Sequence, residues 1–290
     1  MADGWVTEEE WREPYGRANQ GHRSSGGPVA AALAQVPAGA EWALDARARP
    51  VRAVSPTAIT APMPAAPCLP PSPTTVWRSS MFIKICGCRR AEDVAAAAAA
   101  GASAIGMILA PGHRRTLGLD EAARLRRAVP AGVLAVGVFL DQPLEEVRIA
   151  VRAVGCDAVQ LHGREPEDYR EALRADFPLI AAWNLEDPAP LAADWVLVEP
   201  HAGRSGGAGR QWDWGRAHGL HLAAPMLLGG GLTPANVAAA CDAALPFGVD
   251  VSSGVEVGGR KDPSRISLFC EAVRRWEEGR AQLVAAHDRA

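Results

Sequence analysis

Two side chains suited to proton transfer stand at the ends of short apolar runs. Cys86 ends the run Phe82–Cys86, and Glu199 ends the run Trp195–Glu199. A thiol whose pKa is shifted toward neutrality can take up a proton, and a carboxyl held in a pocket can give one. Each residue also has a structural interpretation: a free cysteine is often buried in a core, and a glutamate at a strand end can be a solvated charge. The pair predicts a base and an acid on opposite sides of a bound substrate.

Glycine clusters indicate a phosphate. Three of them follow successive apolar runs in the second half of the chain, as Gly206-Gly207-Ala208-Gly209, Gly229-Gly230-Gly231 and Ser252-Ser253-Gly254. Backbone N–H groups can approach a phosphate closely where glycine removes the side chain. One such cluster can be a simple turn, but three together favour an anion site. The candidate phosphate ligands are Gly207, Gly209, Gly230, Gly231, Ser253 and Gly254.

Four other polar residues at run ends are candidate substrate ligands: Arg115, Gln160, His162 and Asp250. A guanidinium such as that of Arg115 grips a carboxylate with two hydrogen bonds. Histidines such as His162 are more often structural than catalytic. Arginine is abundant in this chain, so Arg115 can equally be a solvated surface residue. Cys86 and Cys88 lack neighbouring His or Cys partners in the sequence, so we expect no metal.

These residues need a scaffold that brings distant strand ends together. From Phe82 onward, eight short apolar runs alternate with helical patterns, which predicts a single (β/α)₈ TIM barrel over residues 81–276. Helices near Asp187–Ala193 and Trp214–His218 are expected to be short, and the last helix to end at Trp276. A doubly wound open sheet is the alternative, but no GxGxxG follows the first strand.

The segment before the barrel has a different composition. Residues 1–80 hold 11 of the 23 prolines, which predicts a disordered extension. Three interpretations of it stay open: a translation start placed too early with Met81 as the true initiator, a functional disordered extension, or an organelle transit peptide. Residues 277–290 are expected to form a C-terminal tail.

Charge and hydropathy exclude several classes of partner. The formal net charge is −3, which argues against binding to nucleic acid or to an anionic membrane. No uninterrupted apolar segment is long enough to span a bilayer, and the acidic start does not resemble a signal peptide. The six cysteines contain no CxxC pair, so we expect a reduced, cytoplasmic protein. We expect its partner to be a small molecule and its oligomeric state to be a monomer or a homodimer.

Taken in order, the motifs resemble those of the phosphoribosylanthranilate isomerase family. The resemblance covers residues 81–276 and none of residues 1–80. The matching segments are Lys84-Ile85-Cys86-Gly87, Arg115, Gln160-Leu161-His162-Gly163, Gly206-Gly207-Ala208-Gly209, Gly230-Gly231-Leu232, and the run from Asp250 to Glu256, followed by Lys261. Only two of the 30 basic residues are lysines, and both fall inside these motifs.

The resemblance implies a cofactor-free Amadori rearrangement of N-(5-phosphoribosyl)anthranilate in tryptophan biosynthesis. Cys86 would match the family's base and Arg115 its ligand for the anthranilate carboxylate. Asp250 would hold the substrate amine or hydroxyls, and the last two loops its phosphate. The family's acid is an aspartate where this chain has Glu199, and the family's Ser-Pro before the arginine is His113-Arg114 here.

These departures keep three alternatives open. A related barrel enzyme acting on another aminosugar phosphate, such as the histidine-pathway isomerase, would use paired aspartates, which Cys86 disfavours. A non-catalytic descendant would bind the phosphosugar without converting it. A hydrolase using Cys86 and His162 as nucleophile and base lacks an evident orienting partner.

Overall fold

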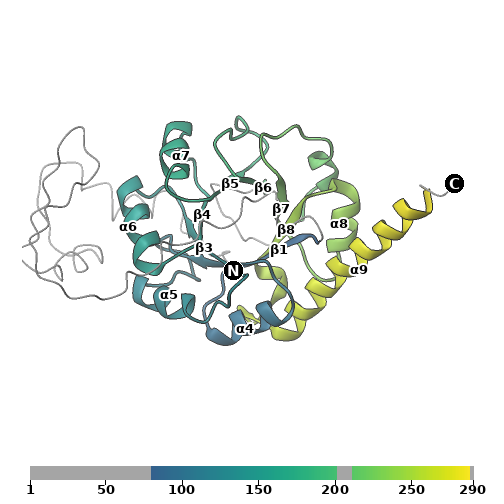
Figure 1. Ribbon diagram of the computed structural model, residues 1–290, viewed down its shortest axis with the longest axis horizontal. Coiled ribbons are helices and arrows are strands. Elements are labelled where there is room, and N and C mark those ends of the chain that lie inside the picture. The colour runs from purple at the N-terminus through teal and green to yellow at the C-terminus, as the bar shows by residue number, and fades with distance from the viewer. Residues whose placement is uncertain (1–79, 201–210, 288–290) are drawn as a thin grey trace, which may run out of the picture.

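Eight parallel strands close into a barrel in the computed structural model, which describes residues 80–200 and 211–287. Each strand pairs with its sequence neighbours, and β8 returns to pair with β1. This is the predicted TIM barrel, seen end-on in Figure 1. The strands are β1 (Phe82–Cys86), β2 (Ala104–Ile108), β3 (Leu134–Phe139), β4 (Ala158–Leu161), β5 (Leu179–Trp183), β6 (Trp195–Val198), β7 (Met226–Leu228) and β8 (Gly248–Val251).

Helices surround the barrel on the outside (Figure 1). They are α4 (Ala91–Ala99), α5 (Leu119–Arg126), α6 (Leu144–Val154), α7 (Glu167–Arg174), α8 (Val237–Ala244) and α9 (Pro263–His287), with short 3₁₀ turns η1 (Trp214–Ala217) and η2 (Ser253–Val255). Acidic residues occupy the first turns of α4, α5, α6 and α7, where they complement the positive end of the helix dipole. A small antiparallel hairpin of β9 (Glu256–Val257) and β10 (Arg260–Lys261) follows η2.

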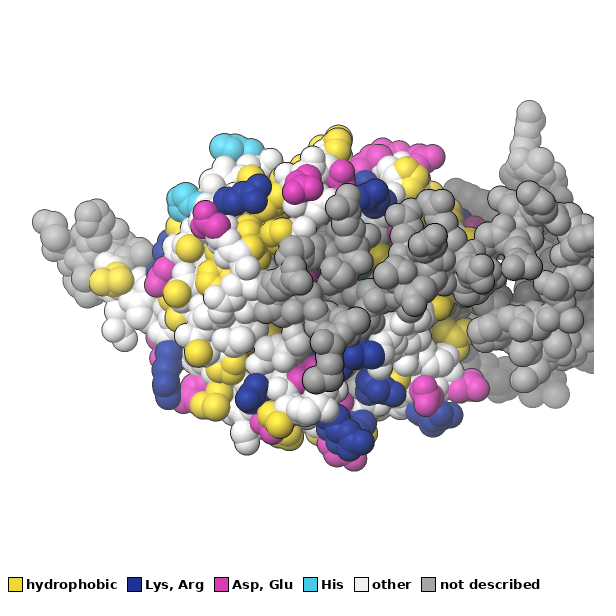
Figure 2. All heavy atoms as spheres, turned by 180° about the vertical axis from the view of Figure 1, so that it is seen from behind, with side chains coloured by type: hydrophobic (Ala, Val, Ile, Leu, Met, Phe, Trp, Pro, Cys, Tyr) yellow, Lys and Arg dark blue, Asp and Glu magenta, His cyan; other side chains and the backbone are white. Residues whose placement is uncertain are grey.

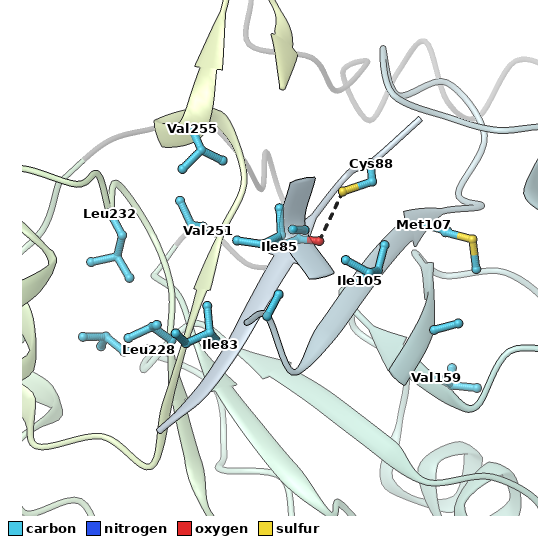
Figure 3. Packing of buried hydrophobic residues seen from close by; sticks show 14 of the residues in the cluster. Ile83, Ile85, Cys88, Ile105, Met107, Val159, Leu228, Leu232, Val251 and Val255 are labelled. Atoms are coloured by element: carbon cyan, nitrogen blue, oxygen red, sulfur yellow. Dashed lines mark hydrogen bonds between the residues drawn. The ribbon is translucent and has the colours of Figure 1, made fainter. Parts of the chain in front are cut away.

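Strand β1 shows how the barrel divides its side chains between two layers. Ile83 and Ile85 pack outward in a large cluster shared with the helices, whereas Phe82 and Cys86 belong to the two clusters inside the barrel. Because residues two apart on a strand share a face, Lys84 also points inward. Figure 3 shows the outward layer, in which the Cys88 thiol lies 3.7 Å from the Ile85 carbonyl oxygen and is directed away from the barrel interior.

The structure departs from the sequence predictions at two helices and one hairpin. No helix forms over residues 184–194, all of which are described, because Pro188 and Pro190 each remove a backbone donor there. Helix α9 does not end at Trp276 but continues to His287, so residues 277–287 extend it instead of forming a tail. The added residues are mostly good helix formers. The β9–β10 hairpin was not predicted, and the predicted disorder of residues 1–80 falls almost wholly outside the described residues.

Within the described ranges, none of the helices combines the length and apolar character that a membrane crossing requires. On the face shown in Figure 2, the described Lys and Arg side chains are interspersed with Asp and Glu. Opposite charges therefore alternate over this surface.

Candidate active site

One pocket lies where the barrel strands end, and it gathers most of the predicted site residues. Cys86, Arg115, Gln160, His162, Glu199 and Asp250 line it, together with Gly230, Gly231, Ser253 and Gly254. His113, Ile108, Val138 and Leu232 complete much of its wall. Parallel strands bring their carboxyl ends to one rim, which is why residues so far apart in the sequence meet there. Gly207 and Gly209 lie outside the described residues.

Cys86 lies beside a buried ion pair. The Lys84 ammonium is fully buried and lies 2.7 Å from Asp250 Oδ1. Burial raises the pKa of the Cys86 thiol, while the Lys84 ammonium, which also hydrogen-bonds the thiol, acts in the opposite direction. The Lys84 charge thus offsets part of the upward shift in the thiol pKa, to which the Asp250 carboxylate also contributes.

Gln160, within β4, and His162, directly after that strand, form a polar pair at the rim. The Gln160 side-chain amide lies 3.1 Å from His162 Nδ1. Burial lowers the pKa of His162 to about 4, so its imidazole is neutral at pH 7. Gln160 Oε1 is buried and accepts no hydrogen bond from the described residues, so it offers an acceptor to the pocket.

Glu199 follows β6 directly and is almost fully buried, with a relative exposure of 7%. Its backbone N–H donates to the Trp183 carbonyl at 2.9 Å, which extends the strand pairing to the pocket rim. A methyl group on Gly230 would lie 2.9 Å from Trp212 Nε1 and 3.5 Å from Glu199 Cγ. The absence of a side chain at Gly230 therefore makes room for both the longer carboxylate and the indole.

The loops after β7 and β8 carry the glycines that the sequence predicts to bind an anion. Gly230 and Gly231 both have positive φ, at 84° and 69°, which favours glycine. The indole N–H groups of Trp212 and Trp214 donate to the Gly229 and Gly230 carbonyls at 3.0 and 3.3 Å. These two contacts hold the loop after β7 against the tryptophans, and the Gly229 N–H donates to the Val198 carbonyl at 3.0 Å.

Ser252, the residue that follows β8, links this strand to β1 through a hydrogen bond. The Ser252 hydroxyl donates to the Cys86 carbonyl at 3.0 Å, and the Lys261 ammonium donates to the Ser252 carbonyl at 2.8 Å. Ser253 and Gly254 follow in η2 and line the pocket. Ser252 is thus fixed by structural contacts, which leaves Ser253 as the hydroxyl candidate for the anion.

Glu256 is a buried carboxylate that the sequence analysis did not single out. It holds Arg115, which lines the pocket. Glu256 accepts hydrogen bonds from Arg115 Nε at 2.7 Å, Arg114 at 2.6 Å and Lys261 at 2.8 Å. Arg115 also passes close over Gly87, where an added methyl would lie 2.6 Å from its Cδ. Three cations around one carboxylate leave a net positive charge behind Arg115, which is the cation of the three that lines the pocket.

The comparisons with known proteins agree with this geometry. The sequence model of the family "N-(5'phosphoribosyl)anthranilate (PRA) isomerase" matches residues 83–272. The chain belongs to this family. A relative from Chromohalobacter salexigens, named N-(5'-phosphoribosyl)anthranilate isomerase, is 43% identical over 201 residues, which cover 66% of this chain and 93% of the relative.

Solved structures of the family superpose on the barrel. The phosphoribosyl anthranilate isomerase of Thermus thermophilus has a TM-score of 0.61 and 34% identity, with coverage of 67% of this chain and 99% of that one. A second structure has a TM-score of 0.57, 28% identity and coverage of 67% and 98%. It is a phosphoribosyl anthranilate isomerase in complex with reduced 1-(o-carboxyphenylamino)-1-deoxyribulose 5-phosphate.

The close packing of the loop after β8 against the loop after β7 leads to a prediction at Gly254. An added methyl there would lie 1.8 Å from the Leu232 carbonyl oxygen, so Gly254→Ala must push the loops after β7 and β8 apart. We expect KM for a phosphorylated substrate to rise at least about tenfold, with about 1–3 kcal/mol lost from the free energy of unfolding. Steady-state kinetics and chemical denaturation measure both.

A matched control is Gly279→Ala in α9, where an added methyl meets nothing within 4 Å. This change should leave KM unaltered and should stabilise the helix by about 0.5–1 kcal/mol. An unchanged KM in Gly254→Ala would show that the spacing of these two loops does not matter for binding.

Glu256 allows a stability prediction. Glu256→Gln leaves three cations without their shared anion, so the free energy of unfolding at pH 7 should fall by about 3 kcal/mol. Burial opposes ionisation of this carboxyl, but hydrogen bonds from Arg115, Arg114 and Lys261 together with the Lys261 charge lower its pKa to about 2. A lowered carboxyl pKa stabilises the fold above the unfolded-state pKa, and that stabilisation is lost as pH falls toward 2.

Urea denaturation from pH 7 down to pH 3 checks both the size and the pH dependence of this effect. The variant should lose stability less steeply below pH 4.5 than the unmodified protein. Glu271→Gln is the matched control, because Glu271 pairs with Arg275 on the exposed face of α9 and should contribute under about 1 kcal/mol. Equal effects of the two substitutions would contradict the anchoring role of Glu256.

Proposed function

We propose that this chain isomerises N-(5-phosphoribosyl)anthranilate to 1-(2-carboxyphenylamino)-1-deoxyribulose 5-phosphate in tryptophan biosynthesis. The observation that carries the proposal is one pocket with three parts. Its lining combines a thiol and a carboxyl, glycines from the loops after β7 and β8, and the Arg115 guanidinium. These parts match the reacting centre, the phosphate and the carboxylate of that substrate.

The reaction then proceeds by two proton transfers. Glu199 gives a proton to the furanose ring oxygen, and the ring C–O bond breaks to leave a protonated Schiff base. Cys86, as thiolate, removes the proton from C2′, and the electron pair of that bond forms the enolamine. Tautomerisation of the enolamine yields the ketose product, so no oxidant or cofactor is consumed.

The other pocket residues hold the substrate during these steps. Arg115 binds the anthranilate carboxylate, while Gly230, Gly231, Ser253 and Gly254 bind the phosphate through N–H and hydroxyl donors. Gln160, His162 and Asp250 face the amine and the sugar hydroxyls. The oligomeric state, monomer or homodimer, and the cytoplasmic location remain predictions from the sequence.

The test is turnover by the purified full chain, followed by the fluorescence change of the anthranilate group as substrate is converted. Complementation of a tryptophan auxotroph lacking this step is the cellular counterpart. Turnover together with growth is expected. Tight binding of a reduced product analogue without turnover would instead identify a non-catalytic phosphosugar-binding protein.

A further inference from the structure

A second cavity, of about 460 Å³, shares Arg115 with the active-site pocket. It lies between the loop after β1, helix α5 and the β9–β10 hairpin. Its volume falls within the usual range of small-molecule sites, roughly 300–1,000 Å³. The basic side chains in its lining are Arg89, Arg90, Arg115, Arg124, Arg260 and Lys261.

The acidic side chains in this lining, Asp93, Glu121 and Glu256, are already engaged. Asp93 pairs with the Arg90 guanidinium at 2.6 Å. Glu121 accepts the Gly118 N–H at 3.1 Å, at the start of α5. Glu256 accepts from the three cations described above. Six basic side chains therefore face only three carboxylates, and the cavity carries an excess of positive charge.

Three arginines of the lining lack a carboxylate partner. Among the residues that the structure describes, Arg89, Arg124 and Arg260 form no ion pair, and the Arg89 guanidinium donates to the Arg114 carbonyl at 3.4 Å. They come from three separate segments, the loop after β1, α5 and β10, which the closed barrel gathers around one cavity. Like charges held near one another repel, and an anion placed among them removes that cost.

We propose that this cavity is a second anion site, which binds a small molecule carrying two or more phosphate groups. The guanidiniums of Arg89, Arg124 and Arg260 are its ligands. A guanidinium is always charged and donates two parallel hydrogen bonds to phosphate oxygens. Three of them on three walls match the several oxygens of linked phosphates, whereas a single carboxylate offers too few acceptors for all three.

Arg115 links this site to the active-site pocket, because its side chain lines both. Its guanidinium is held by Glu256, which lines the second cavity. An anion bound there lowers the positive potential at Arg115 and so weakens the binding of a negatively charged group in the active-site pocket. By linkage, each ligand weakens the other by the same factor. This coupling rests on the proposed function, whereas the anion site itself does not.

The first test is titration calorimetry of the full chain with pyrophosphate. Arg124→Gln should weaken binding about tenfold, as expected for the loss of hydrogen bonds to a charged group. Arg127→Gln is the matched control, since it removes the same charge next to the end of α5. Arg127 donates to the Ala123 carbonyl at 3.3 Å and does not line the cavity, so this variant should bind pyrophosphate as the unmodified protein does.

The second test measures the coupling. The Kd of reduced 1-(2-carboxyphenylamino)-1-deoxyribulose 5-phosphate is measured at rising pyrophosphate concentrations. It should increase about fivefold, at the low end of ordinary coupling between sites, and then level off. In Arg124→Gln the same increase should require about tenfold more pyrophosphate.

The other outcomes each contradict part of this inference. Equal losses in Arg124→Gln and Arg127→Gln, or no binding of pyrophosphate, would overturn the anion site. A Kd that rises without a plateau would place pyrophosphate in the active-site pocket instead. An unchanged Kd would remove the coupling and keep the site. If pyrophosphate binds as expected but the reduced product analogue does not bind, the proposed function fails and the anion site stands.

Discussion

Replacing Cys86 by alanine should lower kcat by about 10²- to 10⁴-fold while KM changes little, because general-base catalysis is typically worth that much. The thiol lines the pocket, and its proposed role is to remove a proton, which does not require it to hold the substrate. The variant should fold, since the substitution deletes a single heavy atom. Stopped-flow or steady-state assays on the purified variant measure the loss.

The adjacent cysteine supplies a matched control. Cys88 is fully buried, and its thiol is directed into the outer layer, near the Ile85 carbonyl. Cys88→Ala should therefore keep kcat and lose some stability. If Cys86→Ala retained more than about a tenth of kcat, Cys86 would be a packing residue, and the base would have to be another group.

The assignment of Cys86 as the base also predicts the direction in which kcat/KM changes with pH. Burial raises the pKa of Cys86, so the thiolate becomes more abundant as pH rises. For the unmodified protein, kcat/KM should climb with pH on the alkaline side of neutrality, and this limb should disappear in Cys86→Ala. A flat profile in the unmodified protein would argue against a thiolate base.

The second large effect is expected at Glu199. Glu199→Gln should reduce kcat by about 10²- to 10⁴-fold, because an amide cannot protonate the ring oxygen. Side-chain volume is nearly conserved, so binding of the reduced product analogue and the free energy of unfolding should both persist. A near-normal kcat would transfer the acid role to another group, with Asp250 the next to substitute.

Glu199→Asp asks whether the pocket has adapted to the longer side chain. The open space above Gly230, bounded by Trp212, fits the extra methylene of the glutamate. Aspartate would leave its carboxyl about 1 Å short, and we expect kcat to fall about 10²-fold. A rise in kcat would mean that the pocket still has the geometry of the family's aspartate.

The sequence predicted the barrel well because its signals are local and repeated. Each strand is a short, mostly apolar run with little exposed surface, and the structure confirms all eight strands. The gathering of Cys86, Glu199 and Asp250 in one pocket follows from the fold alone, since parallel strands end at a common rim.

What the sequence could not show depends on contacts between distant residues. Glu256 looked like one member of a motif, yet three cations converge on it from the β2–α5 loop and from the β9–β10 hairpin. His113 Nδ1 accepts the backbone N–H of Arg115, two residues along the chain, a contact that no residue spacing reveals. The length of α9 was missed because no proline or cap marks its end at Trp276.

The contacts that build the pocket also bear on how the chain reaches its native state. Lys84 and Asp250 are 166 positions apart, and Arg115 and Glu256 are 141 apart. Joining segments so distant costs loop-closure entropy, and non-local pairings of this kind slow folding. Without the pairing of β8 with β1, the Cys86 thiol would lack the Lys84–Asp250 ion pair beside it. Arg115 would likewise lack its partner Glu256. The complete pocket therefore requires the closed barrel, in which both ends of the sequence of strands have met.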